Sequence, residues 1–258
     1  MTPKRMGWLA LAAVLLVEAV AVAAAFDATP HNGGDNAGYL TLAHSLVERG
    51  AYLELWDPGE PPHTKYPPGF PLVLAGLMVL GARTWAAFKL VPAAAALVSV
   101  GMTFLLARQR VGVGLAAGVA LLLGLSTSVV YHSSLVLSDL PFLALTLLAL
   151  AAFDRADRDV EADRTGERWF RLGAVVAIAA YFTRSAGLPL IVAVLGWLAL
   201  RRMWRRLGLF AVAFGLPALV WLFRARGVAT AGGGEYLSLI HISEPTRQPA
   251  TSRMPSSA

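Results

Sequence analysis

Cysteine is absent from this 258-residue chain, and charged residues make up only 15% of it. Without cysteine the chain has no disulfide, no thiolate nucleophile and no zinc-thiolate site. The hydrophobic content of 57% departs from the composition of soluble globular domains. The sequence also lacks the alternation of apolar and polar residues that barrel strands show. The fold class that remains is all-α, a polytopic bundle of transmembrane helices.

Apolar residues gather in blocks that suit membrane-spanning helices, which need about 17 to 25 residues each. Several blocks are shorter, and the pattern sets their ends only approximately. We predict about seven spans. They cover residues 6–26, 88–107, 111–131, 140–153, 170–182, 188–200 and 207–223. The first block also fits a signal peptide that ends in the small residues Ala23 to Ala25, but its length favours a span.

Basic residues are concentrated in four short clusters between the apolar blocks, and this distribution predicts the orientation of the chain. Lys and Arg in short loops favour the cytoplasmic side of a membrane. The clusters are Lys4 with Arg5, Arg108 with Arg110, the arginines within 154–168, and those within 201–206. All four fall on one side only if the short apolar segment 70–82 does not cross. We therefore place the N-terminus in the cytoplasm and this segment along the outer face.

On this topology residues 27–88 form one long external loop with a surface-lying segment, and residues 154–168 form a solvated cytoplasmic connector. The net charge is +6. Basic clusters that flank apolar blocks are orientation signals, and they do not resemble the basic face of a nucleic-acid-binding protein. We therefore expect the membrane as a partner and no nucleic acid.

The end of the chain has a different composition. From Leu237 to Arg247 the sequence resembles one reading frame of a sequencing-library adaptor, and a run rich in Pro, Ser and Thr follows. We therefore divide the chain into residues 1–236, the N-terminal part of a membrane domain, and residues 237–258, a non-native tail.

Asp35 opens a helix-like stretch in the predicted external loop. Apolar residues recur at helical spacing from Tyr39 to Val47, and Gly50 can end the helix. This pattern predicts an amphipathic surface helix. Asp35 itself has two interpretations: it caps the first turn of the helix, or its carboxylate is held for chemistry at the mouth of the bundle.

A second group of candidates precedes the surface-lying segment. Pro67 and Pro68 fix an extended backbone and a rigid turn. Lys65 could bind a phosphate as a point charge, or it could be an interfacial lysine beside an aromatic ring. His63 could ligate a metal or form a hydrogen bond with a substrate.

Asp139 and Arg184 occupy unusual positions for charged residues. Asp139 lies at the boundary of an apolar run, where an unpaired carboxylate is costly, so a metal, a cation or a capped helix start should compensate it. Arg184 lies in a predicted external hairpin, against the positive-inside trend. It could contact lipid headgroups, or it could clamp a substrate phosphate with two hydrogen bonds.

Together these motifs resemble the GT-C superfamily of membrane glycosyltransferases. They are the Asp35–Tyr39 pair, the Lys65-to-Gly69 turn, Ser138-Asp139-Leu140 and Thr183-to-Gly187. The most similar branch is the bacterial one related to protein O-mannosyltransferases and to the aminoarabinose transferase of lipid A. The resemblance implies transfer of a sugar from a polyprenyl-phosphate donor to a lipid, glycan or protein acceptor. The reaction would take place at the outer face of the bacterial cytoplasmic membrane, usually with inversion at the anomeric carbon.

By this resemblance Asp35 and Asp139 are the catalytic carboxylates. Asp35 would act as general base or activate the acceptor. Asp139 would hold the acceptor or a divalent cation, which is the one cofactor that the resemblance leaves open. Lys65 and Arg184 would neutralise the phosphate of the donor as it leaves. Further donor contacts are expected from Tyr39, Tyr66 and His63.

The chain departs from the family pattern in three respects. Tyr66 separates Lys65 from the two prolines, which puts the direction of the lysine in doubt. Asn36 stands where the protein mannosyltransferases usually carry an acidic residue, which puts a shared metal site in doubt. Family members are also longer, so the resemblance implies that the parts that recognise the acceptor lie beyond this chain.

Two other classes of function compete with the transferase. A transporter or lipid-carrier translocase would use Asp139 and Arg184 to mark a transport path. A non-catalytic membrane scaffold would use neither. A transporter predicts functional charges in the middle of spans, whereas these candidates lie at the outer ends, so the pattern favours the enzyme.

Overall fold

The computed structural model describes residues 3–31, 35–161 and 165–230. Within these ranges the chain is helical, apart from connecting segments and an isolated bridge between Leu53 and Pro62. The elements are α1 (Pro3–Ala25), α2 (Asn36–Arg49), α3 (Gly69–Val79), α4 (Trp85–Val111), α5 (Val113–Gly124), α6 (Thr127–His132), α7 (Asp139–Glu161), α8 (Glu167–Thr183), the 3-10 turn η1 (Ser185–Gly187), α9 (Leu188–Leu200) and α10 (Trp204–Thr230). The all-α bundle is therefore confirmed. The predicted tail, residues 237–258, lies outside the described residues.

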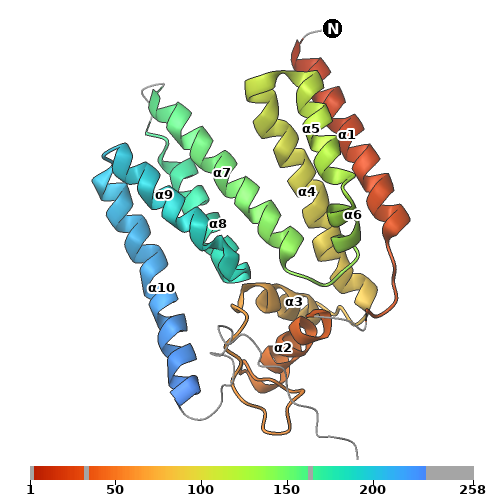
Figure 1. Ribbon diagram of the computed structural model, residues 1–258, viewed down its shortest axis with the longest axis vertical. Coiled ribbons are helices and arrows are strands. Elements are labelled where there is room, and N and C mark those ends of the chain that lie inside the picture. Colours follow the sequence, from red (N-terminus) through yellow and green to blue (C-terminus); the bar gives the residue numbers. More distant parts are fainter. Residues whose placement is uncertain (1–2, 32–34, 162–164, 231–258) are drawn as a thin grey trace, which may run out of the picture.

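The long helices stand side by side as a bundle, and two helices cover one of its ends (Figure 1). Helix α7 lies in the middle, with α4 on one flank and α8 on the other. Helices α1 and α5 complete the α4 flank, and α9 and α10 complete the α8 flank. Helices α2 and α3 lie across the opposite end from the N-terminus. Helix α3, which lies within segment 70–82, is thus oriented across the bundle and not along it.

Within the described residues, three helices are long and apolar enough to cross a membrane: Arg5–Ala25, Trp85–Val111 and Trp204–Gly227. The segments Val113–Gly124 and Ser185–Leu200 are apolar but shorter. The predicted span at residues 111–131 is wrong as a single helix, because α5 ends at Gly124 and α6 begins at Thr127. The hydroxyl of Ser126 accepts a hydrogen bond from the backbone N–H of Val129 and caps α6, which favours a new helix at this point.

The connector predicted at residues 154–168 is also largely wrong, because α7 continues as a helix to Glu161. Charged pairs one turn apart stabilise this extension. Arg158 contacts Asp154 at 2.8 Å and Arg155 contacts Asp159 at 3.4 Å. The polar residues that predicted a loop instead form the surface of a helix, where their charges are paired.

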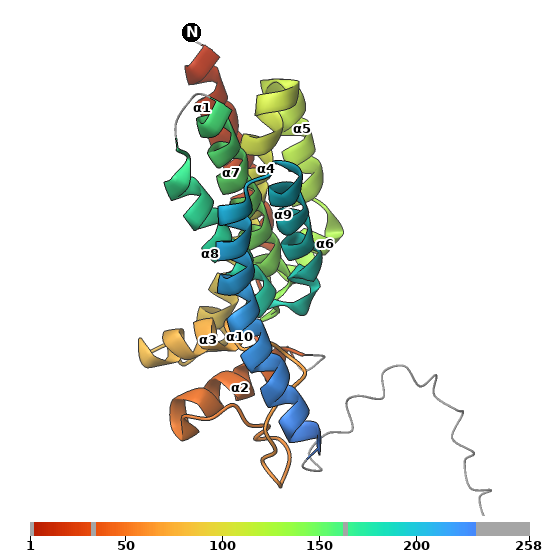
Figure 2. The same ribbon diagram turned by 90° about the vertical axis from the view of Figure 1, so that its left-hand side faces the viewer.

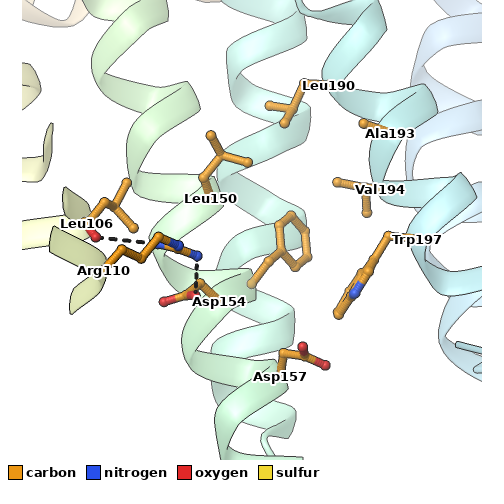
Figure 3. A pocket seen from close by; sticks show the side chains of 10 residues that line it. Leu106, Arg110, Leu150, Asp154, Asp157, Leu190, Ala193, Val194 and Trp197 are labelled. Atoms are coloured by element: carbon orange, nitrogen blue, oxygen red, sulfur yellow. Dashed lines mark hydrogen bonds and ion pairs between the residues drawn. The ribbon is translucent and has the colours of Figure 1, made fainter.

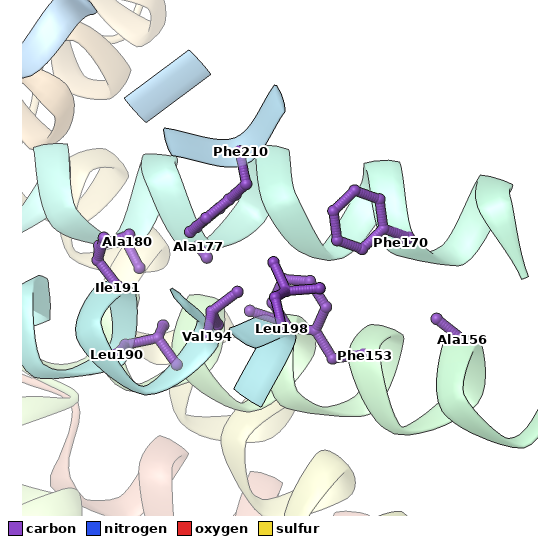
Figure 4. Packing of buried hydrophobic residues seen from close by; sticks show 11 residues of the cluster. Phe153, Ala156, Phe170, Ala177, Ala180, Leu190, Ile191, Val194, Leu198 and Phe210 are labelled. Carbon is purple, nitrogen blue, oxygen red and sulfur yellow. The ribbon is translucent and has the colours of Figure 1, made fainter. Parts of the chain in front are cut away.

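The largest buried cluster joins α7, α8, α9 and α10 (Figure 4). Phe153, Phe170, Leu198 and Phe210 pack around small residues of α8. A methyl group added at Gly173 would lie 3.0 Å from the ring of Phe153. The small residue therefore allows α7 and α8 to approach closely, as is common between membrane helices.

The two ends of the bundle differ in charge. At the end opposite α2 and α3, the arginine clusters pair with acidic residues of α7, including Arg110 with Asp154 and Arg201 with Asp157. A cavity of about 390 Å³ opens beside the first of these pairs, between α4, α7 and α9, with Leu150 and Trp197 in its apolar wall (Figure 3). We call this end the arginine-rich end.

Candidate functional site

Asp35 stands directly before α2, at the end of the bundle that α2 and α3 cover. Its side chain is exposed and makes no capping hydrogen bond to the helix. The neighbouring Asn36 is buried, and its side-chain oxygen accepts a hydrogen bond of 2.7 Å from the backbone N–H of Val136. Asn36 therefore anchors α2 to the segment before α7, while the carboxylate of Asp35 stays available to solvent.

Tyr39 lies one helical turn after Asp35 and connects α2 to α7. Its phenol oxygen is 2.9 Å from the hydroxyl of Ser138, and its ring packs against Tyr66 and Phe70 at centroid distances of 4.8 and 5.0 Å. Burial raises the pKa of the Tyr39 phenol, although the hydrogen bond with Ser138 lowers it in part. Tyr39 therefore serves as a neutral hydrogen-bonding wall.

Asp139 and Arg184 form the ion pair at the centre of this site. A guanidinium nitrogen of Arg184 donates to the carboxylate of Asp139 at 2.6 Å and lies 3.4 Å from the hydroxyl of Ser138. The two charged side chains are 37% and 40% exposed, so solvent screens the pair and it contributes at most about 1 kcal/mol to stability. Of the compensating groups that the sequence left open for Asp139, the structure shows a cation, Arg184.

Gly69 brings the proline-rich turn against the end of α8. A Cβ atom at this position would lie 2.5 Å from the carbonyl oxygen of Phe182 and 2.8 Å from the backbone nitrogen of Thr183. No real Cβ contact is that short, so only glycine permits this approach. The turn that carries Lys65 and Tyr66 therefore packs directly beside the segment that leads to Arg184.

Lys65 is exposed, and its ammonium group lies 4.8 Å from the centre of the Tyr66 ring. This arrangement is a cation–π contact. Of the two interpretations given by the sequence, the structure shows the lysine beside an aromatic ring. The ammonium group remains accessible to an anion that approaches from solvent.

His63 is 2% exposed, and both of its ring nitrogens are engaged. Nδ1 lies 2.8 Å from a carboxylate oxygen of Glu54, and Nε2 accepts a hydrogen bond of 2.8 Å from the backbone N–H of Tyr66. Burial lowers the pKa of His63, while Glu54 opposes this effect. His63 thus positions Tyr66 and offers no nitrogen to a metal or a substrate, in contrast to the role expected from the sequence.

Arg224 of α10 is a component of the site that the sequence analysis did not identify. Its guanidinium group donates to the backbone carbonyls of His63, at 2.6 Å, and Tyr52, at 3.1 Å, and it lies over the Tyr52 ring. The available signal was an arginine directly after the apolar block 207–223. Through this contact α10, which runs past the bundle to the level of α2 (Figure 2), holds the loop that carries His63 and Lys65.

Among the described residues no group of three or more His, Asp or Glu side chains could hold a metal ion. A divalent cation shared by Asp35 and Asp139 stays a prediction. The geometry presents an exposed carboxylate, a half-exposed guanidinium group oriented by Asp139, and a wall of tyrosine rings. Such a set can take a proton from one substrate and bind a phosphate of another.

Comparison with known proteins shows the fold. No protein-family model matches the chain, and no curated protein sequence matches it. The structure is similar to the crystal structure of ArnT from Cupriavidus metallidurans in the apo state, with a TM-score of 0.64 and 20% sequence identity. The match covers 95% of this chain and 46% of the ArnT chain, so the chain spans less than half the length of that protein. ArnT is a lipid A aminoarabinose transferase of the GT-C family. At 20% identity the likeness shows the fold alone, which this chain shares with part of ArnT.

Proposed function

We propose that this chain belongs to a membrane glycosyltransferase that moves a sugar from a polyprenyl-phosphate donor to a lipid, glycan or protein acceptor at the outer face of the bacterial cytoplasmic membrane. The observation that carries the proposal is the convergence of α2, α7 and α8 at one end of the bundle. There Tyr39, Ser138, Asp139 and Arg184 form a hydrogen-bonded cluster beside the exposed Asp35. The fold shared with ArnT supports the class of reaction.

In the proposed reaction Asp35 accepts the proton of the acceptor hydroxyl group. The acceptor oxygen then forms a bond with the anomeric carbon as the bond from that carbon to the phosphate oxygen breaks. The phosphate leaves with the electron pair, and Arg184 and Lys65 stabilise its growing negative charge. Attack from the face opposite the leaving group inverts the anomeric carbon.

Asp139 has a positioning role in this scheme. Its carboxylate and the hydroxyl of Ser138 hold one guanidinium nitrogen of Arg184, and Tyr39 holds Ser138 in turn. The rest of the planar guanidinium group is then oriented for a phosphate. Its partial exposure leaves a path for the substrate.

Substitutions of Arg184 and Asp35 test donor binding and the chemical step separately. Arg184→Gln in the purified chain should weaken binding of a polyprenyl-phosphate sugar by about tenfold, because one charge-assisted contact to phosphate is worth about 1.5 kcal/mol or more. Arg83→Gln is the matched control, since Arg83 is exposed at the same end of the bundle, just before α4. Equal binding by the Arg184 and Arg83 variants would remove Arg184 from the donor site.

Asp35→Asn should leave donor binding unchanged. In the natural protein that contains residues 1–236, Asp35→Asn should lower the rate of sugar transfer about 10²- to 10⁴-fold, the range for a lost general base. Membrane insertion, followed by fractionation, should stay the same. Transfer at the wild-type rate would show that Asp35 is not the base.

One observation favours the translocase alternative. Glu18 in α1 is fully buried, and neither of its carboxylate oxygens has a hydrogen-bond partner among the described residues. A carboxyl group inside an apolar span is the feature expected of a transport path. Glu18→Gln decides between the two functions: a transferase should keep its rate of sugar transfer, whereas a translocase should lose lipid-carrier movement measured in vesicles.

A further inference from the structure

A basic cavity lies at the arginine-rich end of the bundle, remote from the candidate site. It has a volume of about 670 Å³ and is formed by the turn between α9 and α10, the first turns of α10, and the start of α8. Its charged lining residues are Arg202, Arg205, Arg206 and Glu167. Among the described lining residues, three arginines face one carboxylate.

The single acidic side chain among these four is already paired. Arg206 contacts Glu167 at 3.4 Å and also donates to the backbone carbonyl of Thr165. Arg171, outside the cavity, contacts the same carboxylate at 3.1 Å. The side chains of Arg202 and Arg205 are exposed, and the described part of the chain gives neither of them a hydrogen bond or an ion pair. Two guanidinium groups are therefore left for an anion.

Arg202 stands where a helix end normally carries glycine. Its φ of 54° is left-handed. The backbone N–H of Met203 donates to the carbonyl of Leu198, and that of Arg202 donates to the carbonyl of Ala199. This is the helix-ending motif in which glycine is the usual left-handed residue, because other L residues adopt the conformation at a cost. Despite that cost an arginine occupies the position, and its guanidinium group lies at the cavity.

An exposed apolar surface continues from the cavity along α10. Leu209 lines the cavity, and Val212 and Leu216 follow on the same face of the helix at intervals of three and four residues. These three side chains are 55%, 59% and 62% exposed. Trp204 at the start of α10 is also exposed, and tryptophan favours the interface of a membrane. A ligand that fits the whole surface has an anionic head and an apolar chain.

We propose that this cavity binds an anionic phospholipid. The phosphodiester lies between Arg202 and Arg205, and an acyl chain follows Leu209, Val212 and Leu216 along α10. Charge complementarity selects an anionic over a zwitterionic headgroup, and the apolar continuation selects a lipid over a free phosphate ion. The proposal does not depend on the sugar-transfer reaction, since none of these residues belongs to the candidate site.

The test compares lipid binding by the full chain purified in detergent, measured by native mass spectrometry. Each arginine beside an anionic headgroup contributes roughly a factor of five in affinity. The wild type should therefore prefer phosphatidylglycerol to phosphatidylcholine by roughly 25-fold, and a variant with Arg202→Gly and Arg205→Gln should lose this preference. Arg168→Gln is the matched control, because Arg168 is exposed at the same end but lies outside the cavity.

The single substitution Arg202→Gly distinguishes a loss of lipid binding from a folding defect. Glycine adopts a left-handed φ freely, so this variant should unfold at the wild-type temperature or above it and yet bind phosphatidylglycerol about fivefold more weakly. An unchanged lipid preference in the double variant would overturn the proposal. So would an equal loss in Arg168→Gln, or complete displacement of the lipid by inorganic phosphate.

Discussion

At the scale of single residues, Gly69 provides the sharpest test of the site. Gly69→Ala should destabilise the chain by about 1 to 3 kcal/mol, the usual cost of overpacking, because the new methyl group meets the backbone of Phe182. Gly76→Ala in the same helix is the control, since no atom lies within 4 Å of a Cβ there, and it should be neutral or slightly stabilising. Thermal unfolding in detergent measures both. A neutral Gly69 variant would show that the turn does not pack against α8.

His63 makes the loop beside the site sensitive to pH. Because burial lowers the pKa of His63 below its ordinary value of 6.5, the folded loop binds fewer protons than the unfolded loop. Stability therefore rises with pH through this window and is lost as the pH falls through 6.5 towards the lowered pKa. Protonation also places a hydrogen on Nε2, which faces the N–H of Tyr66.

Hydrogen exchange of residues 51–66, corrected for the intrinsic effect of pH, should show reduced protection below about pH 6. His63→Gln should flatten this dependence. His44→Gln should not, because His44 is exposed on α2 and pairs with Glu48 one turn away. If residues 51–66 of the wild type were equally protected on both sides of about pH 6, protonation of His63 would not control the stability of the loop.

The sequence identified Asp139 and Arg184 as candidates but not as partners of one another, and it missed Arg224. Asp139 and Arg184 were each recognised as unusual, because each conflicts with its local surroundings. Their pairing depends on the position of the end of α8 against the start of α7, which is a tertiary contact. The expected ligand-binding role of His63 also ignored a tertiary contact. Its hydrogen bond to Glu54 depends on how the loop folds back, which the local sequence does not show.

At the scale of elements, α10 is coupled to the loop of residues 51–66 through Arg224. Arg224→Ala removes hydrogen bonds to the carbonyls of His63 and Tyr52. We expect protection of residues 51–66 from hydrogen exchange to fall about tenfold, which corresponds to about 1.4 kcal/mol. Phe223→Ala is the control, because Phe223 precedes Arg224 in α10 and its side chain is exposed. A similar loss in both variants would mean that the apolar surface of α10, and not the guanidinium group, holds the loop.

Helix boundaries were predicted well where strong local signals exist and poorly where polarity was the only guide. The amphipathic helix at residues 35–50 was confirmed as α2, with Gly50 at its end in a left-handed conformation. The break at Ser126 was missed although Ser126, Thr127 and Ser128 interrupt the apolar block and serine is a common N-cap. Residues 154–161 were assigned to a loop because ion pairs one turn apart cannot be distinguished from solvated charges by composition alone.

At the scale of the whole molecule, the separation of charge between the two ends supports a single orientation in the membrane. At one end Arg110, Arg158 and Arg201 pair with acidic residues of α7. At the other end Asp139 and Arg184 pair with each other, and Asp35 precedes α2. The sequence predicted this arrangement because topology alternates from span to span, so a single rule about loop charge constrains every loop at once.

The absence of cysteine makes that orientation directly measurable. Single cysteines at Asp57 and Ser185, both exposed near the candidate site, should react with a membrane-impermeant maleimide in intact cells. A cysteine at Gln109, exposed at the arginine-rich end, should react only after the membrane is permeabilised. The physical reason is the positive-inside preference of the arginine clusters, and the wild-type chain supplies an unlabelled background. Labelling of the cysteine at Gln109 in intact cells would show the opposite orientation. Labelling of the cysteine at Asp57 but not of the one at Ser185 would show that the two parts of the site lie on opposite sides of the membrane.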